Sequence, residues 1–250
     1  MAADRQTLVH LGNLCFDDFL LLPPQTLDFG LRTSDLASDW SLAINNAPHV
    51  GLHFQVGDGG RAAGQPSLAD IRAAQHRLVT HFALELLKAK APPLYDSLPW
   101  HDWDFSIIAK RFKLWQSRFL LAGDGTTVTM CRCRKSAGVY VVEPSETIAG
   151  YIERKAAAER IRRFKLLRVS LEHVPLPDRS TDLAVVGSIP NDLAPSALTE
   201  LSRVAANVLL IENSPLSPPL PESPLTNAGF RADSVEVSGL GTRRCWWLTT

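Results

Sequence analysis

A glycine turn between two apolar runs constrains this chain of 250 residues more than any other feature. The first run, 119–122, leads into the motif Gly-Asp-Gly-Thr-Thr at 123–127. The second run, 139–142, stops at Glu143, and a third follows at 166–171. Strands that alternate with helical patterns predict a parallel sheet with crossover helices. A glycine turn after the first strand and an acid after the second are typical of the nucleotide site in such sheets.

The local chemistry of this turn suits a ligand. Gly123 and Gly125 have no Cβ, so the backbone can pass close to a bound molecule. A helix that begins at about Thr126 would direct its free N–H groups to the same side. Glu143, at the end of the neighbouring strand, could accept both hydroxyls of a ribose.

With these motifs the chain resembles the class I S-adenosylmethionine-dependent methyltransferases, of the broad group that includes the ubiquinone/menaquinone enzymes. The resemblance covers roughly residues 95 to 250 and extends to the segment Val-Pro-Leu-Pro-Asp-Arg-Ser-Thr-Asp at 174–182. It implies an α/β fold with a Rossmann-like sheet of seven strands, mostly parallel, with an antiparallel closing strand and helices on both faces. It also implies S-adenosyl-L-methionine as the cofactor and S-adenosylhomocysteine as the product.

The resemblance further implies which residues contact the ligands. The cofactor contacts would be Gly123, Asp124, Gly125, Thr126, Glu143, Pro144, Leu171, Glu172, Gly187 and Ser188. Tyr95, Trp100 and Trp103 precede the first strand and would line the substrate pocket, with ordinary packing on the sheet as the alternative. His101 lies among these aromatic residues and is the candidate catalytic base, because histidine titrates near neutral pH.

Three positions depart from the family pattern. Leu121 and Ser170 stand where acids are expected, and Thr127 stands at the third glycine. A hydrogen bond to a charged group contributes about 1.5–3 kcal/mol, so these departures predict weaker cofactor binding.

Three functions therefore remain open. The first is methyl transfer to an O- or C-nucleophile of a small molecule, because the loop that begins at Ser188 lacks the Asn/Asp-Pro-Pro-aromatic tetrad of enzymes that methylate amino groups. The second is a catalytically inactive domain that serves as an assembly or binding partner for protein or RNA through a basic layer of helices. The third is a protein or RNA methyltransferase that uses this basic layer for docking.

Charge is distributed unevenly along a chain whose formal net charge is zero. Residues 104–168 contain 14 Lys and Arg against six Asp and Glu. Right-handed crossovers would bring the helices around the first strands to one side of the sheet. The sequence thus predicts a basic face within 110–165 that could contact RNA or an acidic protein, or could simply be solvated. Its expected members are Arg132, Arg134, Lys135, Arg154, Lys155, Arg160, Arg162 and Arg163.

The N-terminal part, residues 1–94, is expected to be an extension or cap that precedes a methyltransferase-like domain at 95–250. Its clearest element is one long helix over 67–91, which starts with a capping box at Ser67 and Asp70. Residues 49–56 alternate like a strand.

Nothing in the sequence indicates a membrane, a secretory signal or a metal. No apolar run reaches 18 residues, the start lacks a basic stretch followed by an apolar core, and the four cysteines have no zinc-site spacing. We therefore expect a cytoplasmic protein with reduced thiols, no membrane span and no metal site.

Overall fold

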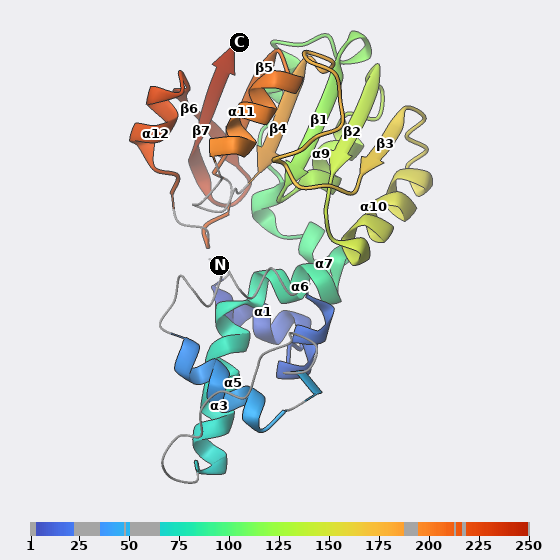
Figure 1. The fold of residues 1–250 in the computed structure, drawn as a ribbon. Helices are drawn as coiled ribbons and strands as arrows, with labels where there is room; N and C mark the ends of the chain where they lie inside the picture. Colours follow the sequence, from blue (N-terminus) through green and yellow to red (C-terminus); the bar gives the residue numbers. More distant parts are fainter. Residues whose placement is uncertain are drawn as a thin grey trace. The chain divides into compact units, whose positions relative to one another are not determined.

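The computed structural model describes residues 4–22, 36–47, 49–50, 66–187, 195–212, 214–216 and 219–249. The chain divides into two compact units, residues 1–95 and 96–250, whose elements are labelled in Figure 1. Among the described residues, no helix is long and apolar enough to cross a membrane.

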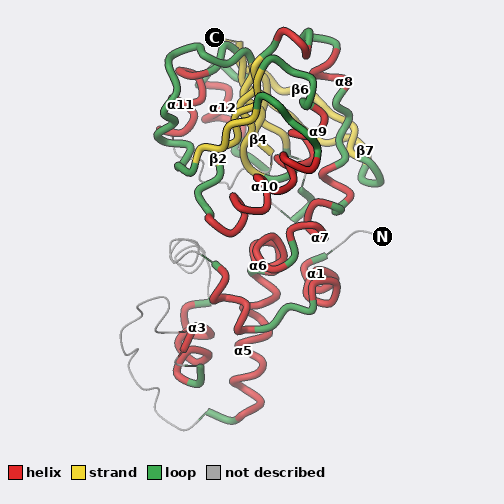
Figure 2. Tube along the Cα trace, turned by 90° about the vertical axis from the view of Figure 1, so that its right-hand side faces the viewer, coloured by secondary structure: helices red, strands yellow, loops and turns green. Residues whose placement is uncertain are grey.

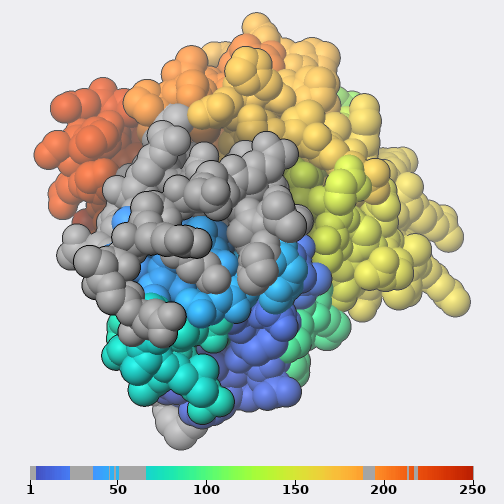
Figure 3. All heavy atoms as spheres, turned by 60° about the horizontal axis from the view of Figure 1, so that its bottom comes forward, coloured from blue at the N-terminus to red at the C-terminus, as the bar shows by residue number. Residues whose placement is uncertain are grey.

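The N-terminal unit is helical. Its elements are α1 (Arg5–Gly12), the 3-10 helix η1 (Phe16–Leu21), α3 (Ala37–Asn45), α5 (Leu68–His81), α6 (Ala83–Lys90) and α7 (Pro92–Asp96). Helix α1 packs against α5 and α6, and the blue and teal surfaces adjoin in the space-filling view (Figure 3). The rings of Phe19, Trp40 and Phe82 form an aromatic cluster, with centroids 5.6 Å apart for Phe19–Trp40 and 5.5 Å for Phe19–Phe82.

Two expectations for this unit need revision. The helical segment after Ser67 is not continuous, because Phe82 leaves the helical conformation (φ −93°, ψ 18°) and separates α5 from α6. This break lets the Phe82 ring pack edge-on against Phe19. Of the strand expected at 49–56, His49 and Val50 are helical, and the rest lies outside the described residues.

The C-terminal unit is built on one sheet of seven strands in the order β3-β2-β1-β4-β5-β7-β6. The strands are β1 (Arg118–Gly123), β2 (Gly138–Val142), β3 (Phe164–Leu167), β4 (Leu183–Gly187), β5 (Asn207–Ile211), β6 (Arg231–Val237) and β7 (Gly241–Thr249). The pairs among β1 to β5 are parallel, whereas β7 is antiparallel to both β5 and β6. The predicted sheet, mostly parallel with an antiparallel closing strand, is confirmed.

Helices cover both faces of this sheet, as Figure 2 shows for α11 and α12 on one side and α8 and α9 on the other. The helical elements are η2 (Pro99–His101), α8 (Ser106–Ala109), η3 (Leu114–Gln116), α9 (Thr126–Arg132), α10 (Glu146–Ala158), α11 (Pro195–Val204) and α12 (Glu222–Asn227). Leu120 and Ala122 of β1 join a buried cluster with Leu201 of α11 and Trp246 of β7. Because side chains alternate along a strand, the equally buried Leu121 faces the opposite layer.

Strand β3 is shorter than the apolar run at 166–171 predicted. Its pairing with β2 ends at Val142↔Leu167, followed by a hydrogen bond from Glu143 N to Leu167 O (3.0 Å). The next N–H of this segment that would face β3 is that of Ser145, and it donates to Glu143 Oε1 (3.0 Å) instead of continuing the ladder. The strand therefore stops before Ser170.

Candidate functional site

The carboxyl ends of β1 and β4 meet at two glycines. Gly123 pairs with Gly187 and has a φ of +75°. A Cβ on Gly123 would lie 2.1 Å from the Gly187 carbonyl oxygen, which also accepts a hydrogen bond from Asp124 N (2.9 Å). The close approach of β4 thus requires glycine at position 123. The sequence analysis gave a different reason for this glycine, the approach of a ligand to the backbone.

The second glycine of the turn packs against the candidate base. Gly125 has a φ of +72° and directly precedes α9. A Cβ at this position would lie 3.3 Å from Cδ2 of His101, whose side chain is buried. Thr126 fixes the turn by donating its hydroxyl to Gly123 O (2.7 Å). The imidazole therefore covers the face of the turn that the sequence assigned to the cofactor.

The carboxylates that flank His101 in sequence have other partners. Asp102 accepts a hydrogen bond from the Arg132 guanidinium. Asp104 accepts from both the backbone N–H (2.9 Å) and the hydroxyl (2.7 Å) of Ser106, and these bonds lower the pKa of Asp104.

Glu143 is a buried carboxylate at the carboxyl end of β2. It is 7% exposed, and its Oε1 accepts a hydrogen bond from Ser145 N (3.0 Å). Strands β1 and β2 are neighbours, with Leu121 opposite Val141, so Glu143 lies on the strand beside the one that ends in the glycine turn. The adjacent Pro144 is exposed. This arrangement keeps an acid beside the turn, at the place where the sequence predicted it.

A second buried acid, which the sequence analysis missed, lies at the start of this unit. Asp96 accepts hydrogen bonds from the hydroxyls of Thr127 on α9 and Tyr151 on α10 (2.6 Å for Tyr151) and pairs with Lys155. Burial and the Asp96 carboxylate raise the pKa of Tyr151. Thr127, the residue at the third glycine position, thus anchors α9 to Asp96. No motif marks Asp96 in the sequence.

The aromatic segment that precedes β1 is packed into this unit. Trp100 and Trp103 are both buried. Trp103 forms an antiparallel bridge with Val237, its carbonyl accepts from Arg132 (2.5 Å), and its ring lies with Ile211 around a narrow space at the carboxyl ends of β1, β4 and β5. Tyr95, the third candidate substrate contact, belongs to the N-terminal unit and is buried there.

An open groove of about 660 Å³ adjoins this segment. Its lining combines the aromatic rings of Trp103 and Phe105 with polar groups of Arg132, Asp104 and Glu236. It ends at the turn between β6 and β7, and because β6 runs parallel to β1 through β5, this turn lies at the same sheet edge as Gly123. The groove therefore lies at the same end of the sheet as the glycine turn.

The remaining predicted cofactor contacts follow β3 and β4. Leu171 is half-buried and packs against the cluster beneath α11. Glu172 is exposed, and its Oε1 accepts from Ser196 Oγ (3.3 Å). Gly187 ends β4, and Ser188 lies outside the described residues.

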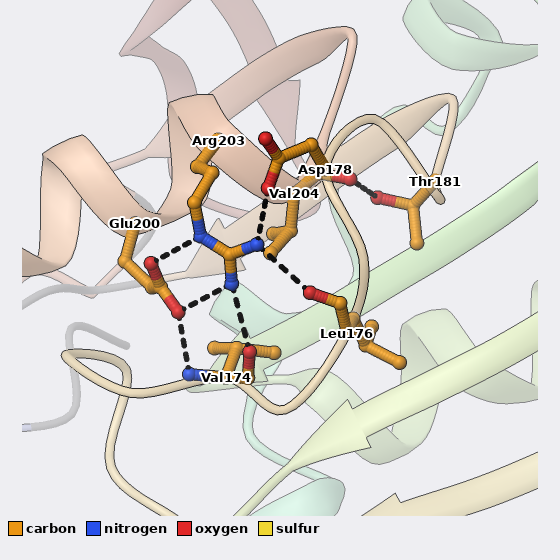
Figure 4. A network of polar contacts seen from close by, with 7 residues as sticks. All are labelled: Val174, Leu176, Asp178, Thr181, Glu200, Arg203 and Val204. Carbon is orange, nitrogen blue, oxygen red and sulfur yellow. Dashed lines mark hydrogen bonds and ion pairs between the residues drawn. The ribbon is translucent and has the colours of Figure 1, made fainter.

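Arg203 holds the segment 174–181, which leads from this region to β4 (Figure 4). Its guanidinium donates to the carboxylates of Glu200 (both bonds 2.7 Å) and Asp178 (2.6 Å) and to the carbonyls of Val174 and Leu176. Glu200 also accepts from Val174 N (2.8 Å). The bond from Arg203 lowers the pKa of Glu200. One side chain thus ties an irregular segment to α11.

Comparisons with known proteins gave matches only among solved structures: no family model matches the sequence, and no curated protein does. The structure is similar to a SAM-dependent methyltransferase from Aquifex aeolicus, with 23% identity, a TM-score of 0.48, and coverage of 62% of this chain and 93% of the other. It is similar to magnesium protoporphyrin IX methyltransferase from Synechocystis PCC 6803 with bound SAM, with 12% identity, a TM-score of 0.47, and coverage of 92% and 98%.

The fold itself can be identified from the sheet. Five parallel strands in the order 3-2-1-4-5, closed by an antiparallel β7 between β5 and β6, form the arrangement that the resemblance to methyltransferases implied. The glycine turn follows β1, and the acid Glu143 follows β2. Residues 96–250 therefore have the class I methyltransferase fold.

Proposed function

We propose that residues 96–250 bind S-adenosylmethionine and transfer its methyl group to an O- or C-nucleophile of a small molecule. The observation that carries this proposal is Glu143, a buried carboxylate at the carboxyl end of β2, beside the strand that ends in the glycine turn. A carboxylate is an acceptor of two hydroxyl hydrogen bonds, which suits the adjacent hydroxyls of a ribose. The bond from Ser145 N holds this group in place.

The bound cofactor would supply an electrophilic methyl group, and the chain would supply position. Gly123, Asp124, Gly125 and Thr126 would contact the methionine part, Pro144, Leu171 and Glu172 the adenine, and Gly187 and Ser188 the methyl donor. The groove between Trp103 and Glu236 would hold the acceptor molecule. Alignment of the two reacting atoms then provides most of the rate enhancement.

His101 is proposed as the base that takes a proton from the acceptor. Its burial against Gly125 places it at the turn. To act, the imidazole has to move away from Gly125 toward the groove, because a cofactor in contact with Gly125 needs the same space.

The test is calorimetric titration of the full chain with S-adenosylmethionine and S-adenosylhomocysteine. We expect Glu143→Gln to weaken binding about ten- to a hundredfold, because it replaces charged hydrogen-bond acceptors by a neutral amide. The matched control is Glu146→Gln, an exposed acid on the first turn of α10. Equal affinities for the Glu143→Gln variant and the unmodified chain would contradict the ribose assignment.

A second candidate function is that of a non-catalytic assembly domain. Two observations favour it: His101 packs on Gly125, and Thr127 is bonded to Asp96, so protein groups already contact the turn. Under this alternative, neither compound binds at millimolar concentration. His101→Ala removes the ring from Gly125. If the cofactor site is intact but covered by this ring, the variant binds S-adenosylmethionine more tightly than the unmodified chain does. If the site no longer fits the cofactor, the variant gains no affinity.

A further inference from the structure

Three of the eight cations of the expected basic face have acidic partners. Arg132 is bonded to Asp102 and to Trp103 O. Lys155 pairs with the buried Asp96, and Arg134 lies 3.8 Å from Glu159. These three cations already have acidic partners, so we do not count them as a docking surface.

The cations that remain gather at another place, the edge formed by the amino ends of β1, β2 and β3, which lie together in the upper part of Figure 1. Arg118 pairs with Gly138, and its Cγ lies 3.7 Å from the position of a Gly138 Cβ. Arg163 lies on the other side of the same strand, where its carbonyl accepts from Val139 N (2.8 Å). Neighbouring strands are about 5 Å apart, so the backbones of Arg118 and Arg163 are about 10 Å apart across β2.

Five further cations lie just before β1 or β2 or around the start of β3. All seven are exposed, and none of them forms an ion pair with a carboxylate among the described residues. We call this set the amino-edge cations: Lys113, Arg118, Lys135, Arg160, Arg162, Arg163 and Lys165.

Acids are few at this edge. Asp182 accepts a hydrogen bond from the backbone N–H of Arg118 (2.7 Å) and is exposed. Glu159 lies beside Arg134. The edge therefore keeps a strong excess of positive charge, which attracts polyanions.

An exposed indole lies within the same edge. Trp115 is 66% exposed, the highest value among the large hydrophobic residues of the described chain. It lies in η3 between Lys113 and Arg118. An exposed indole beside cations offers both a stacking surface and positive charge to a partner.

The turn that presents Trp115 is firmly held. Gln116 N donates to Lys113 O (2.8 Å), and the Ser117 hydroxyl donates to the same carbonyl (3.1 Å). Ser117 O accepts from Ala137 N (2.9 Å), which joins the turn to the start of β2. The indole is thus displayed from a fixed backbone, and little conformational entropy has to be lost on binding.

We propose that this edge binds single-stranded nucleic acid, with Trp115 stacking on a base and the amino-edge cations contacting phosphates. Single strands offer unstacked bases to aromatic side chains, and basic grooves follow their backbone. An acidic protein would match the charge alone, and competition by polyglutamate tests that alternative. The edge lies at the opposite end of β2 from Glu143, so this surface is separate from the proposed methyl-transfer site.

The test is fluorescence anisotropy of the full chain with a labelled single-stranded RNA of about 12 nucleotides, a length within the range that single-strand-binding folds cover. We expect Trp115→Ala to weaken binding about tenfold or more, and Trp115→Phe to retain most of the affinity. The double variant Arg118→Gln/Arg163→Gln is expected to reduce the slope of log K against log salt by about 1.4, because each phosphate contact to a single strand contributes about 0.7.

The matched control removes the same charge elsewhere. Arg72→Gln/Arg168→Gln alters one exposed arginine in α5 and one after β3, and it should leave the salt slope unchanged. Circular dichroism verifies that each variant is folded. The proposal is overturned if the RNA does not bind at low ionic strength, if Trp115→Ala binds as tightly as the unmodified chain, or if polyglutamate competes as well as unlabelled RNA.

Discussion

The imidazole of His101 lies directly on Gly125, with 3.3 Å between His101 Cδ2 and the position of a Cβ on the glycine. Gly125 also has a positive φ of +72°. Two separate requirements, a positive φ and space for the imidazole ring, thus select glycine at this position. The energetic cost of each can be measured separately, because the chain also contains a glycine that has a positive φ but no close neighbour.

Gly239 is that glycine: its φ is +71°, and nothing lies within 4 Å of its Cβ position. We expect Gly239→Ala to lower the free energy of unfolding by about 1 kcal/mol, the cost of a left-handed conformation in an L-residue. Gly125→Ala should cost about 1 kcal/mol more, because His101 has to shift. Urea unfolding monitored by circular dichroism gives both values, and equal costs would show that His101 does not pack on Gly125.

Gly123→Ala is expected to be the most harmful change of this series. Its Cβ would lie 2.1 Å from the Gly187 carbonyl oxygen, and backbone atoms cannot rotate away as a side chain can. We expect a loss of about 3–5 kcal/mol, from strain at positive φ together with the separation of β1 from β4. The same urea experiment measures it, and a loss no greater than that of Gly125→Ala would contradict the close contact of the two strands.

Thr127 should contribute to stability through its hydroxyl. Thr127→Val keeps the shape of the side chain and removes the donor to the buried Asp96 carboxylate. We expect a loss of about 2 kcal/mol, the range for a hydrogen bond to a charged group. Thr226→Val, at an exposed position of α12, is the control and should change the free energy of unfolding by less than about 0.5 kcal/mol. A similar small change for Thr127→Val would contradict an anchoring role.

Tyr151 should titrate later than a free phenol. Burial, and then the hydrogen bond to Asp96, raise its pKa in the folded protein. The folded state thus binds the phenolic proton more tightly than the unfolded chain, so this contribution to stability is complete below pH of about 10 and declines as the pH rises further. Ultraviolet titration of the three tyrosines should show one late phenol that is missing in Tyr151→Phe. Identical titration curves would contradict the assignment.

The half-buried Arg203 should contribute strongly to stability. Arg203→Met keeps the apolar stem of the side chain and removes its bonds to Glu200, Asp178 and two carbonyls. We expect a loss of about 2–4 kcal/mol, because polar groups that had partners lose them. Arg231→Met, at an exposed position of β6, is the control. The midpoint of thermal unfolding is measured for both variants. An equal fall in the two midpoints would contradict this role of Arg203.

The pair of Arg203 and Glu200 predicts that the stability of the protein depends on pH in the acidic range. Arg203 lowers the pKa of Glu200 below its unfolded value. This contribution is therefore present above the unfolded pKa of about 4.3 and is lost as the pH falls through the lower folded value. In Glu200→Gln, the decline in stability below pH of about 4 should be less steep than in the unmodified chain. Parallel curves would contradict the pairing.

The sequence alone determined the sheet of the C-terminal unit. Apolar runs such as 139–142, the glycine turn and the acid Glu143 are local signals, and they follow one another at spacings that a parallel sheet with crossovers requires. The run at 119–122 lies in β1, and the antiparallel closing strand that the resemblance implied is β7. Such patterns indicate strands and turns, and they can be recognised because the residues that form them are neighbours in the sequence.

Only the tertiary structure decided which side chains meet. His101 and Gly125 are 24 positions apart, and Asp96 bonds to residues on two helices, so no local pattern could pair them. The sequence likewise did not distinguish among the cations of residues 104–168. In the structure Arg132 and Lys155 pair with acids, whereas Arg118 and Arg163 lie at the strand ends and form no ion pair within the described part of the chain. Composition sets how many charges a chain has, but the contacts between distant segments decide which of them are left to bind a partner.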